Sequence, residues 1–338
     1  MSTHRLRAGL IGLGRMGRHH ARVLRHLPGV DLVAVVDPAG DRYHAADGIP
    51  LLPDLDALVR HGIDYAVLAC PTLLHEPLGT TLAMAGIPTL IEKPLAADTD
   101  AAHRLADAFH AAGVPAAVGY IERFNPALIS LRTRVQDGQL GDIIQITTRR
   151  TGPFPARPLD VGVVHDLATH DIDLTVWITG QHYTSIAART ARRSTGQHQD
   201  LLAALGQLAD GTITQHQANW ISPLTERATI ITGKNGCIIA DTLTTTLTYW
   251  ANQPVEHPAP HPANARDAIH YRINNTEPLL TEHETFRDTV LGHRPPAAPL
   301  QDALHAVQVA NAAIQAAHTA TTITITPAPT APQVTPAA

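Results

Sequence analysis

The sequence has few cysteines, few aromatic residues and no long apolar run. Its two cysteines, Cys70 and Cys237, are too few and too far apart for a disulfide framework or a zinc motif, which favours a reducing compartment. No stretch approaches the roughly 18 apolar residues that a membrane span requires, and the first residues lack the apolar core of a secretory signal. We therefore expect a cytoplasmic protein that does not enter a membrane.

Charge is also scarce, with only 16% charged residues and a formal net charge of −5. This balance argues against a broad basic surface for nucleic acid or for anionic lipids. Hydrophobic residues make up 44% of the chain and aromatic residues only 4%, so mainly Ala, Leu, Val and Ile must fill the core. At 338 residues the chain is long enough for two globular domains.

Over the first 122 residues, short apolar runs alternate with helical stretches. The runs have the length and composition of buried strands and cover residues 6–11, 32–36, 65–69, 89–91 and 116–118. Helical stretches separate most of them, and strands that are joined through helices form parallel sheets. We expect residues 1–122 to form an α/β domain with a parallel sheet.

After about residue 122, strands joined by tight turns replace this alternation. Strand-like runs cover residues 143–149, 183–192, 201–208, 212–220, 228–232, 237–241 and 246–250. The turns Ala209-Asp210-Gly211 and Gly233-Lys234-Asn235-Gly236 predict hairpins, and consecutive hairpins form an open, mainly antiparallel sheet. Such a sheet needs cover on both faces, from helices or from a second subunit.

Helices are expected among and after these strands, at 126–136, 166–178, 281–291 and 300–317. We therefore assign residues 123–325 to an α+β domain that binds substrate and mediates oligomerisation. The Pro/Ala/Thr-rich residues 326–338 are expected to form a disordered tail.

A glycine motif, Gly12-Leu13-Gly14-Arg15-Met16-Gly17, follows the first strand directly and begins the first helix. One glycine makes the tight turn, one lets the backbone approach a pyrophosphate, and one lets the helix pack close to the strand. The amides at the helix N-terminus then point at the phosphates. The motif predicts that residues 1–122 form a Rossmann domain that binds a nicotinamide dinucleotide.

Asp37 lies at the end of the second strand, about 20 residues beyond this motif. A carboxylate there accepts hydrogen bonds from the ribose hydroxyls and repels a 2′-phosphate, so NAD is favoured over NADP. Arg42 nearby keeps NADP open, and a solvated turn residue is the other interpretation of Asp37.

Glu92-Lys93-Pro94 follows the fifth strand, at the edge of the sheet where open parallel sheets bind ligands. A lysine there is placed to donate a hydrogen bond to a substrate oxygen. The alternative is an ordinary surface lysine in a loop.

Asp166, His170 and Asp173 share one helical stripe, because their offsets are four and seven residues. Inward-facing polar residues are costly unless they are paired or used. Imidazole accepts a proton near neutral pH, and a neighbouring carboxylate can orient it. The alternatives are a structural histidine and a metal site formed by His165, Asp166 and His170; we expect no metal.

The chain resembles the glucose–fructose oxidoreductase, inositol dehydrogenase and rhizopine-catabolism (Gfo/Idh/MocA) family over nearly its whole length. The resemblance includes Pro71-Thr72-x-x-His75, Glu92-Lys93-Pro94 and Asp166-x-x-x-His170. It implies a Rossmann domain, a C-terminal open sheet that often forms dimers or tetramers, and hydride transfer to or from nicotinamide. It also implies that Lys93, Asp166 and His170 line the substrate site. Cofactor binding is assigned to Gly12, Gly14, Arg15, Met16, Gly17, Asp37, Pro71, Thr72, His75, Glu92 and Lys93.

A narrower likeness rests on residues 119–126 and on residues 152–155 leading into 160–164. Both segments resemble the branch of this family that oxidises the 3-hydroxyl of UDP-N-acetylglucosamine or its uronic acid. The chain departs from that branch at His165, where an apolar residue is usual. Arg149, Arg150 and Arg157 are interpreted either as a grip for a diphosphate or carboxylate or as solvated side chains. Substrate binding is assigned to Lys93, Tyr120, Arg123, Asn125, Arg157, Asp166 and His170.

The activity expected is NAD-dependent oxidation of a secondary hydroxyl, at C3 of a sugar or nucleotide sugar, to a ketone. His170 would take the hydroxyl proton and Lys93 would polarise the alkoxide, although either could be the formal base, and Asp166 would orient His170 or a sugar hydroxyl. One alternative is an NAD(P)-dependent dehydrogenase or ketoreductase of a free sugar, cyclitol or biosynthetic ketosugar. Another is a non-catalytic NAD-binding sensor. We expect a homodimer or homotetramer formed through the C-terminal sheet, with no nucleic-acid partner.

Overall fold

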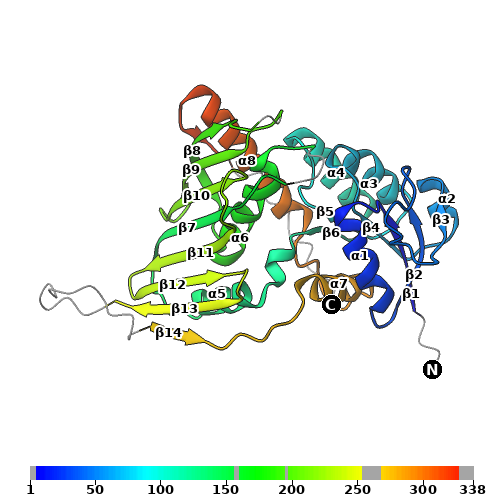
Figure 1. Cartoon of the computed structure of the whole chain (residues 1–338), viewed down its shortest axis with the longest axis horizontal. Coiled ribbons are helices and arrows are strands. Elements are labelled where there is room, and N and C mark those ends of the chain that lie inside the picture. The colour runs from blue at the N-terminus through cyan, green and yellow to red at the C-terminus, as the bar shows by residue number, and fades with distance from the viewer. Residues whose placement is uncertain (1–4, 156–159, 195–196, 253–267, 327–338) are drawn as a thin grey trace, which may run out of the picture.

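Two β-sheets organise the chain, one from its first third and one from the remainder (Figure 1). The structure, a computed structural model, describes residues 5–155, 160–194, 197–252 and 268–326. The expected tail therefore lies almost wholly outside the described residues. Among the residues described, no helix is both long and apolar enough to cross a membrane.

The first sheet has six strands in the order β3-β2-β1-β4-β5-β6, and every pair is parallel. The strands are β1 (Leu6–Ile11), β2 (Val30–Val36), β3 (Leu51–Leu52), β4 (Tyr65–Leu68), β5 (Thr89–Glu92) and β6 (Ala116–Gly119). The helices that join them are α1 (Arg15–His26), α2 (Leu55–Arg60), α3 (His75–Met84) and α4 (Thr99–Ala112). The two-residue strand β3 is an addition that the sequence did not predict. The α/β class with a parallel sheet is confirmed.

Local chemistry explains where these helices begin and end. The Asp54 side chain accepts a hydrogen bond from the Ala57 N–H, and Asp98 accepts one from Ala101, so both α2 and α4 have an N-cap. Gly113 takes the left-handed conformation that ends α4. Strands β4, β5 and β6 are buried along their whole length, as expected for a sheet with helices on both faces.

The second sheet has nine strands in the order β14-β13-β12-β11-β7-β10-β9-β8-β15, and only the β7–β10 pair is parallel. Its strands are β7 (Ile143–Thr151), β8 (Tyr183–Ala191), β9 (Leu201–Leu208), β10 (Ile213–Asn219), β11 (Glu226–Gly233), β12 (Gly236–Asp241), β13 (Thr246–Ala251), β14 (Ala268–Tyr271) and β15 (Ile323–Thr324). The mainly antiparallel sheet is confirmed, and β14 and β15 extend it beyond the predicted strands.

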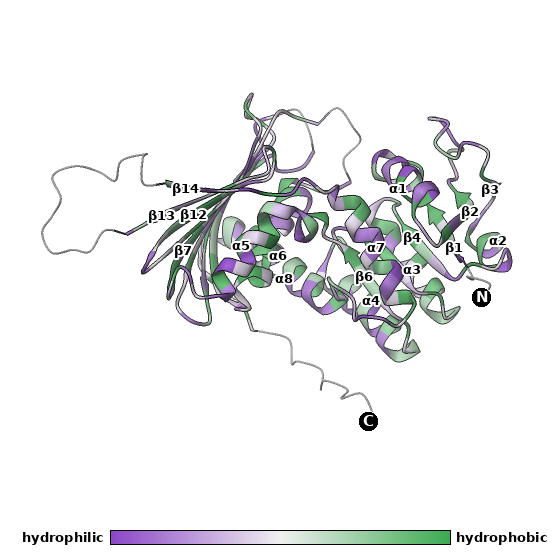
Figure 2. Cartoon of the chain, turned by 90° about the horizontal axis from the view of Figure 1, so that it is seen from below, coloured by the Kyte–Doolittle hydropathy of each residue, from purple (hydrophilic) through white to green (hydrophobic). Residues whose placement is uncertain are grey.

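Helices cover one face of this second sheet and leave the other open in the part of the chain that is described (Figure 2). The covering helices are α5 (Pro126–Gln136), α6 (Thr169–Thr179) and α8 (Leu300–Thr319). Burial alternates along β9, as a sheet with one buried face requires. The open face carries apolar side chains, including Ile144, which is 53% exposed, and Leu205, which is 56% exposed.

The chain crosses between the two sheets three times. A short helical turn, η2 (Ile121–Phe124), leads from β6 to α5, and the predicted domain boundary at residue 122 falls within it. Later, α7 (Pro278–Val290) returns to the first sheet and lies beside α1 (Figure 1). There the Phe286 ring packs edge-on against Tyr65 of β4, with ring centroids 5.8 Å apart. The last crossing comes when α8 and β15 follow α7 back to the second sheet.

Candidate active site

The glycine turn lies between β1 and α1, where each glycine meets a different surrounding. Gly12 has a φ of +95°, and a Cβ there would lie 2.5 Å from the Ala69 carbonyl oxygen at the end of β4. A Cβ on Gly17 would collide with the carbonyl of Gly12, whereas one on Gly14 would have nothing within 4 Å. Two glycines are thus required by the protein's own backbone, and the third faces open space at the free N-terminus of α1, which fits a pyrophosphate.

Asp37 lies directly beyond β2 and holds this turn in place. Its Oδ2 accepts a hydrogen bond of 2.7 Å from the Leu13 N–H, and its Oδ1 accepts one of 2.8 Å from Ala39. Each carboxylate oxygen keeps a lone pair for a ribose hydroxyl. Arg42 is exposed and donates from Nε to the Ala39 carbonyl at 3.3 Å, on the same loop.

The loop after β4 is fastened to the loop after β5. The buried His75 ring faces the Cys70 carbonyl from Nε2, at 3.2 Å, and the Pro94 carbonyl from Nδ1, at 3.0 Å. Burial lowers the pKa of His75 more than its carbonyl contacts raise it, so the ring is neutral and donates one of these bonds. His75 therefore braces the loops of the proposed cofactor site from within. Pro71 and Thr72 lie on the first of these loops, where the Thr72 N–H donates to Asp160 at 2.6 Å.

Lys93 projects from the end of β5 onto the start of α6. Its Nζ donates to Asp166 Oδ1 at 2.8 Å and to the Asp166 carbonyl oxygen at 2.9 Å. Asp166 belongs to a π-helical turn, η3 (Val164–Ala168), which precedes α6 where the sequence predicted an α-helix. The two motifs that lie 73 residues apart in the sequence thus meet as one ion pair.

Glu92 is buried beneath Lys93 and ends a chain of buried groups. Its Oε2 accepts a hydrogen bond from the Lys93 N–H at 3.0 Å, and its Oε1 lies 2.9 Å from Nε2 of His20. Nδ1 of His20 in turn lies 2.8 Å from Nε2 of His283 on α7. Burial works to raise the pKa of Glu92, but the hydrogen bond and charge of His20, with the charge of Lys93, hold it below its ordinary value.

His170 is the second residue of α6 and is buried, without the acidic partner that Lys93 has. Its Nδ1 has no hydrogen-bond partner among the described residues, and its ring meets the buried Tyr120 ring edge-on at 6.1 Å. The Asp166 carboxylate accepts a hydrogen bond from Lys93 and none from His170. Burial lowers the pKa of His170 well below its ordinary value, and the charges of Lys93, Arg150 and Arg227 lower it further. The ring is therefore a neutral proton acceptor.

Three of the residues that the sequence assigned to substrate binding or to an anion grip have partners inside the fold. Arg123 is buried and ion-paired with Asp173 at 2.9 Å from Nε. The Asn125 side chain accepts a hydrogen bond from the Ala127 N–H and so caps α5. Arg150 pairs with Asp171 at 2.9 Å and with Glu122 at 2.6 Å. Their side chains therefore brace the elements around His170.

The remaining predicted arginines lie elsewhere. Arg149 points to the open face of the second sheet, with Nη1 3.7 Å from Glu226, and Arg157 lies outside the described residues. His165 shares a hydrogen bond of 2.9 Å with Asn311 of α8. Among the described residues no group of three His, Cys, Asp or Glu side chains is arranged to hold a metal.

Sequence reasoning missed one cation at this site, Arg227. The predicted strand began at residue 228 and left Arg227 in the preceding turn, whereas β11 begins at Glu226. The signal was available: Arg227 alternates with Thr229 and Ile231, which are buried, so it shares their face of the sheet.

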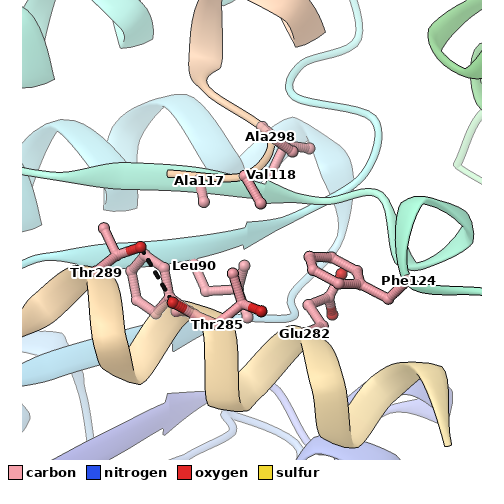
Figure 3. Close-up of a pocket in the computed structure, with 10 residues that line it drawn as sticks. Leu90, Ala117, Val118, Phe124, Glu282, Thr285, Thr289 and Ala298 are labelled. Carbon is pink, nitrogen blue, oxygen red and sulfur yellow. Dashed lines mark hydrogen bonds between the residues drawn. The ribbon is translucent and has the colours of Figure 1, made fainter. Parts of the chain in front are cut away.

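A small cavity lies below the site, between α7 and strands β5 and β6 (Figure 3). Its volume is about 10 Å³, close to the room needed for one water molecule. Glu282 of α7 projects into it beside Phe124, and neither carboxylate oxygen has a hydrogen-bond partner among the described residues. Burial, and to a lesser degree the charge of Glu92, raises the pKa of Glu282 well above its ordinary value.

Comparison with known proteins matches both parts of the chain. The model of an oxidoreductase family with an NAD-binding Rossmann fold matches residues 6–120, and the GFO/IDH/MocA C-terminal domain matches residues 128–239. The UDP-N-acetylglucosamine 3-dehydrogenase of Acidithiobacillus ferrooxidans is 29% identical over 295 residues, or 86% of this chain and 90% of that protein. Inositol 2-dehydrogenase 4 of Saccharopolyspora erythraea is 34% identical over 200 residues, which span 57% of this chain and only 59% of that relative.

Two solved structures are similar to this chain over most of its length. The structure of the UDP-N-acetylglucosamine 3-dehydrogenase GnnA from Acidithiobacillus ferrooxidans has a TM-score of 0.82 and 26% identity, covering 93% of this chain and 98% of its own. GenD2 from gentamicin A biosynthesis, in complex with NAD, has a TM-score of 0.83 and 25% identity, covering 96% of this chain and 97% of its own.

Proposed function

The chain belongs to the Gfo/Idh/MocA oxidoreductase family, and from that premise we propose that it is an NAD-dependent dehydrogenase of nucleotide sugars. The reaction proposed is oxidation of a secondary hydroxyl, at C3 of a substrate such as UDP-N-acetylglucosamine, to a ketone. The observation that carries the proposal is that a cation fixed by Asp166, Lys93, follows β5 of the first sheet and acts electrostatically on a buried, neutral imidazole, His170 of α6.

The mechanism proposed divides the work between these two side chains. A bound nicotinamide supplies the hydride acceptor. His170 accepts the proton of the substrate hydroxyl, since burial and the neighbouring positive charges keep its ring neutral. Lys93, held by Asp166, stabilises the negative charge that develops on the oxygen.

Asp37 supports NAD as the cofactor rather than NADP. Its carboxylate lies beside the glycine turn and keeps acceptor capacity on both oxygens. A 2′-phosphate placed against it would meet a like charge.

The substrate class is supported by the extent of the similarity. The match to the UDP-N-acetylglucosamine 3-dehydrogenase covers 86% of this chain, including both sheets. A cyclitol or free-sugar dehydrogenase is the second candidate, because the inositol dehydrogenase has the higher identity, although over 57% of the chain.

A homodimer or homotetramer is proposed through the open face of the second sheet. Exposed Ile144, Leu205 and Ile213 give that face an apolar character. Light scattering of the purified chain tests this assembly, and a monomer at working concentration would argue against it.

Turnover assays test the function directly. The purified protein is incubated with NAD or NADP and with UDP-N-acetylglucosamine, N-acetylglucosamine or myo-inositol, and reduced cofactor is followed by absorbance. We expect NADH formation with the nucleotide sugar, and a loss of roughly 10²–10⁴-fold in turnover for His170→Ala, since one proton acceptor is removed.

The matched control is His318→Ala, which changes an exposed histidine on α8 and should leave turnover unchanged. Full activity in His170→Ala would overturn the role of His170. The absence of turnover with all three substrates and both cofactors would overturn the proposed function.

A further inference from the structure

Arg227 lies on the face of the second sheet that is turned towards His170. In the register of the sheet it pairs with Arg150 of β7. Arg150 is buried and is held by Asp171 of α6, the residue next to His170. Two arginines therefore stand side by side at the wall of the proposed active site.

The two arginines have different partners. Arg150 donates to the carboxylates of Asp171 and Glu122, so its charge is compensated. Among the described residues, Arg227 donates only from Nη1, to the carbonyl oxygens of Thr151 at 2.6 Å and of Glu226 at 2.7 Å. Within the same residues, no carboxylate lies within 4.0 Å of it, and its Nε and Nη2 make no hydrogen bond. Three of its five N–H donors are thus without an acceptor in the part of the chain that the structure describes.

The surroundings of Arg227 make an uncompensated charge costly. Burial lowers its pKa, and the neighbouring charge of Arg150 lowers it further, against the opposing influence of Asp171, Glu122 and Asp166. A half-buried cation without an acidic partner is stabilised when an anion reaches it. A planar guanidinium with two free edges is well suited to carboxylate or phosphate oxygens.

We propose that Arg227 binds an anionic group of the substrate, a phosphate or a carboxylate, while the sugar hydroxyl faces His170. This inference rests on the proposed function, because it uses the same site. It makes Arg227 a specificity-determining residue: the site prefers anionic sugars to neutral sugars and cyclitols. Of the arginines predicted to grip an anion, Arg150 is already paired and Arg149 faces the other way, while Arg157 lies outside the described residues.

Binding measurements test the inference without requiring turnover. In the presence of NAD, calorimetry gives Kd for UDP-N-acetylglucosamine, glucuronate, N-acetylglucosamine and myo-inositol with the wild type and with Arg227→Gln. We expect the wild type to bind at least one anionic ligand more tightly than either neutral ligand. Arg227→Gln should weaken that binding roughly 10–100-fold, the range of a lost charge-assisted hydrogen bond, and change neutral ligands little. The nucleotide-sugar and glucuronate arms separate phosphate from carboxylate.

Two further variants control for general damage to the site. Arg227→Lys keeps the charge but loses the fork, so its anion affinity should lie between those of the wild type and Arg227→Gln. Arg149→Gln removes a neighbouring arginine from the opposite face and should keep the wild-type ratio of anionic to neutral affinity.

The outcomes separate this inference from the proposed function. Equal affinity of the wild type for anionic and neutral ligands would overturn it, and so would an equal loss for both classes in Arg227→Gln. Arg227-dependent anion binding without NADH formation would leave the inference standing and overturn the proposed dehydrogenase activity.

Discussion

Lys93, which is half-buried, and His170, which is buried, have opposite electrostatic surroundings. Lys93 is held by an acidic partner, whereas His170 is surrounded by the cations Lys93, Arg150 and Arg227. These positive charges, added to burial, keep the His170 ring neutral to a lower pH than an ordinary histidine.

A pH profile tests this arrangement at the residue scale. Because the pKa of His170 is lowered, the acid limb of kcat/KM should lie below pH 6.5, the ordinary value for histidine. Removing a nearby positive charge lets the ring protonate more readily, so Arg227→Gln should move that limb upward. Profiles of the wild type and of Arg227→Gln over pH 4.5–9 measure both effects. A limb that moves downward in Arg227→Gln would contradict the electrostatic account.

Contiguous motifs made several of these residues predictable. Three motifs can be recognised from residues only a few positions apart: the glycine turn, Glu92-Lys93-Pro94 and Asp166-x-x-x-His170. Contacts between distant positions were not predictable, because no local pattern records them. The ion pair of Lys93 with Asp166 depends on how η3 packs against the end of β5, and the placement of Arg227 opposite Arg150 depends on the register of β11 against β7.

At the scale of elements, α7 is the helix whose role the sequence concealed. Its amphipathic pattern predicted a helix at 281–291, and the structure has one at Pro278–Val290. The pattern could not show that this helix packs on the first sheet. There it brings His283 to His20 and buries Glu282 in the small cavity (Figure 3).

Glu282 gives α7 a measurable pH signature. Its pKa is raised in the fold, so the folded protein holds a proton that the unfolded chain releases above about pH 4.5. The stabilising effect of that proton is present below pH 4.5 and is lost as pH rises, at up to about 1.4 kcal/mol per pH unit. Glu282→Gln should therefore be more stable than the wild type at pH 8, and the difference should shrink towards pH 4.5.

Urea unfolding of both proteins at several pH values gives the comparison. Glu284→Gln, a change on the same helix at a partly exposed position, is the matched control and should follow the wild type. A stability difference for Glu282→Gln that is constant with pH would show that Glu282 is not protonated in the fold.

The π-turn before α6 is the other element that the sequence analysis did not anticipate. The stripe of Asp166, His170 and Asp173 predicted a continuous α-helix, and the structure begins it with η3. Five residues are too few for a π-turn to produce a recognisable pattern of apolar and polar residues in the sequence. Its effect is to direct Asp166 towards Lys93, while Asp173 faces Arg123 further along.

At the scale of the whole molecule, buried histidines are spread through both sheets and their covering helices. Burial is the main cause that lowers the pKa of each of them: His75, His165, His170, His216, His283 and His305. For His216 and His305 the pKa falls to about 4. Several imidazoles of the folded protein therefore stay neutral at pH values at which those of the unfolded chain are protonated.

This distribution predicts a fold that loses stability in mild acid. Below pH 6.5 the unfolded chain takes up protons that these buried rings refuse, so their stabilising contribution is complete above pH 6.5 and is lost as pH falls towards 4. Each histidine contributes up to about 1.4 kcal/mol per pH unit. Urea unfolding at pH 7.5, 6.5, 5.5 and 4.5 measures the decline, and His216→Gln should make it shallower. Unchanged stability between pH 6.5 and 4.5 would refute the prediction.

The two-sheet architecture itself was the most predictable property, because alternating strands and helices followed by hairpins leave few other arrangements. The sequence did not predict which elements from late in the chain would pack on which sheet. Strand β15 and helix α7 both come from late in the chain, and one completes the second sheet while the other packs on the first.

The return of α7 has a consequence for synthesis. Residues 1–122 emerge from the ribosome before α7, yet Tyr65 and His20 stay without these partners until Phe286 and His283 follow, His283 being 263 positions after His20. The packing around the first sheet is therefore complete only after α7 has been synthesised. A fragment that ends at the predicted boundary would lack both the Phe286 ring that packs on Tyr65 and the His283 ring that meets His20.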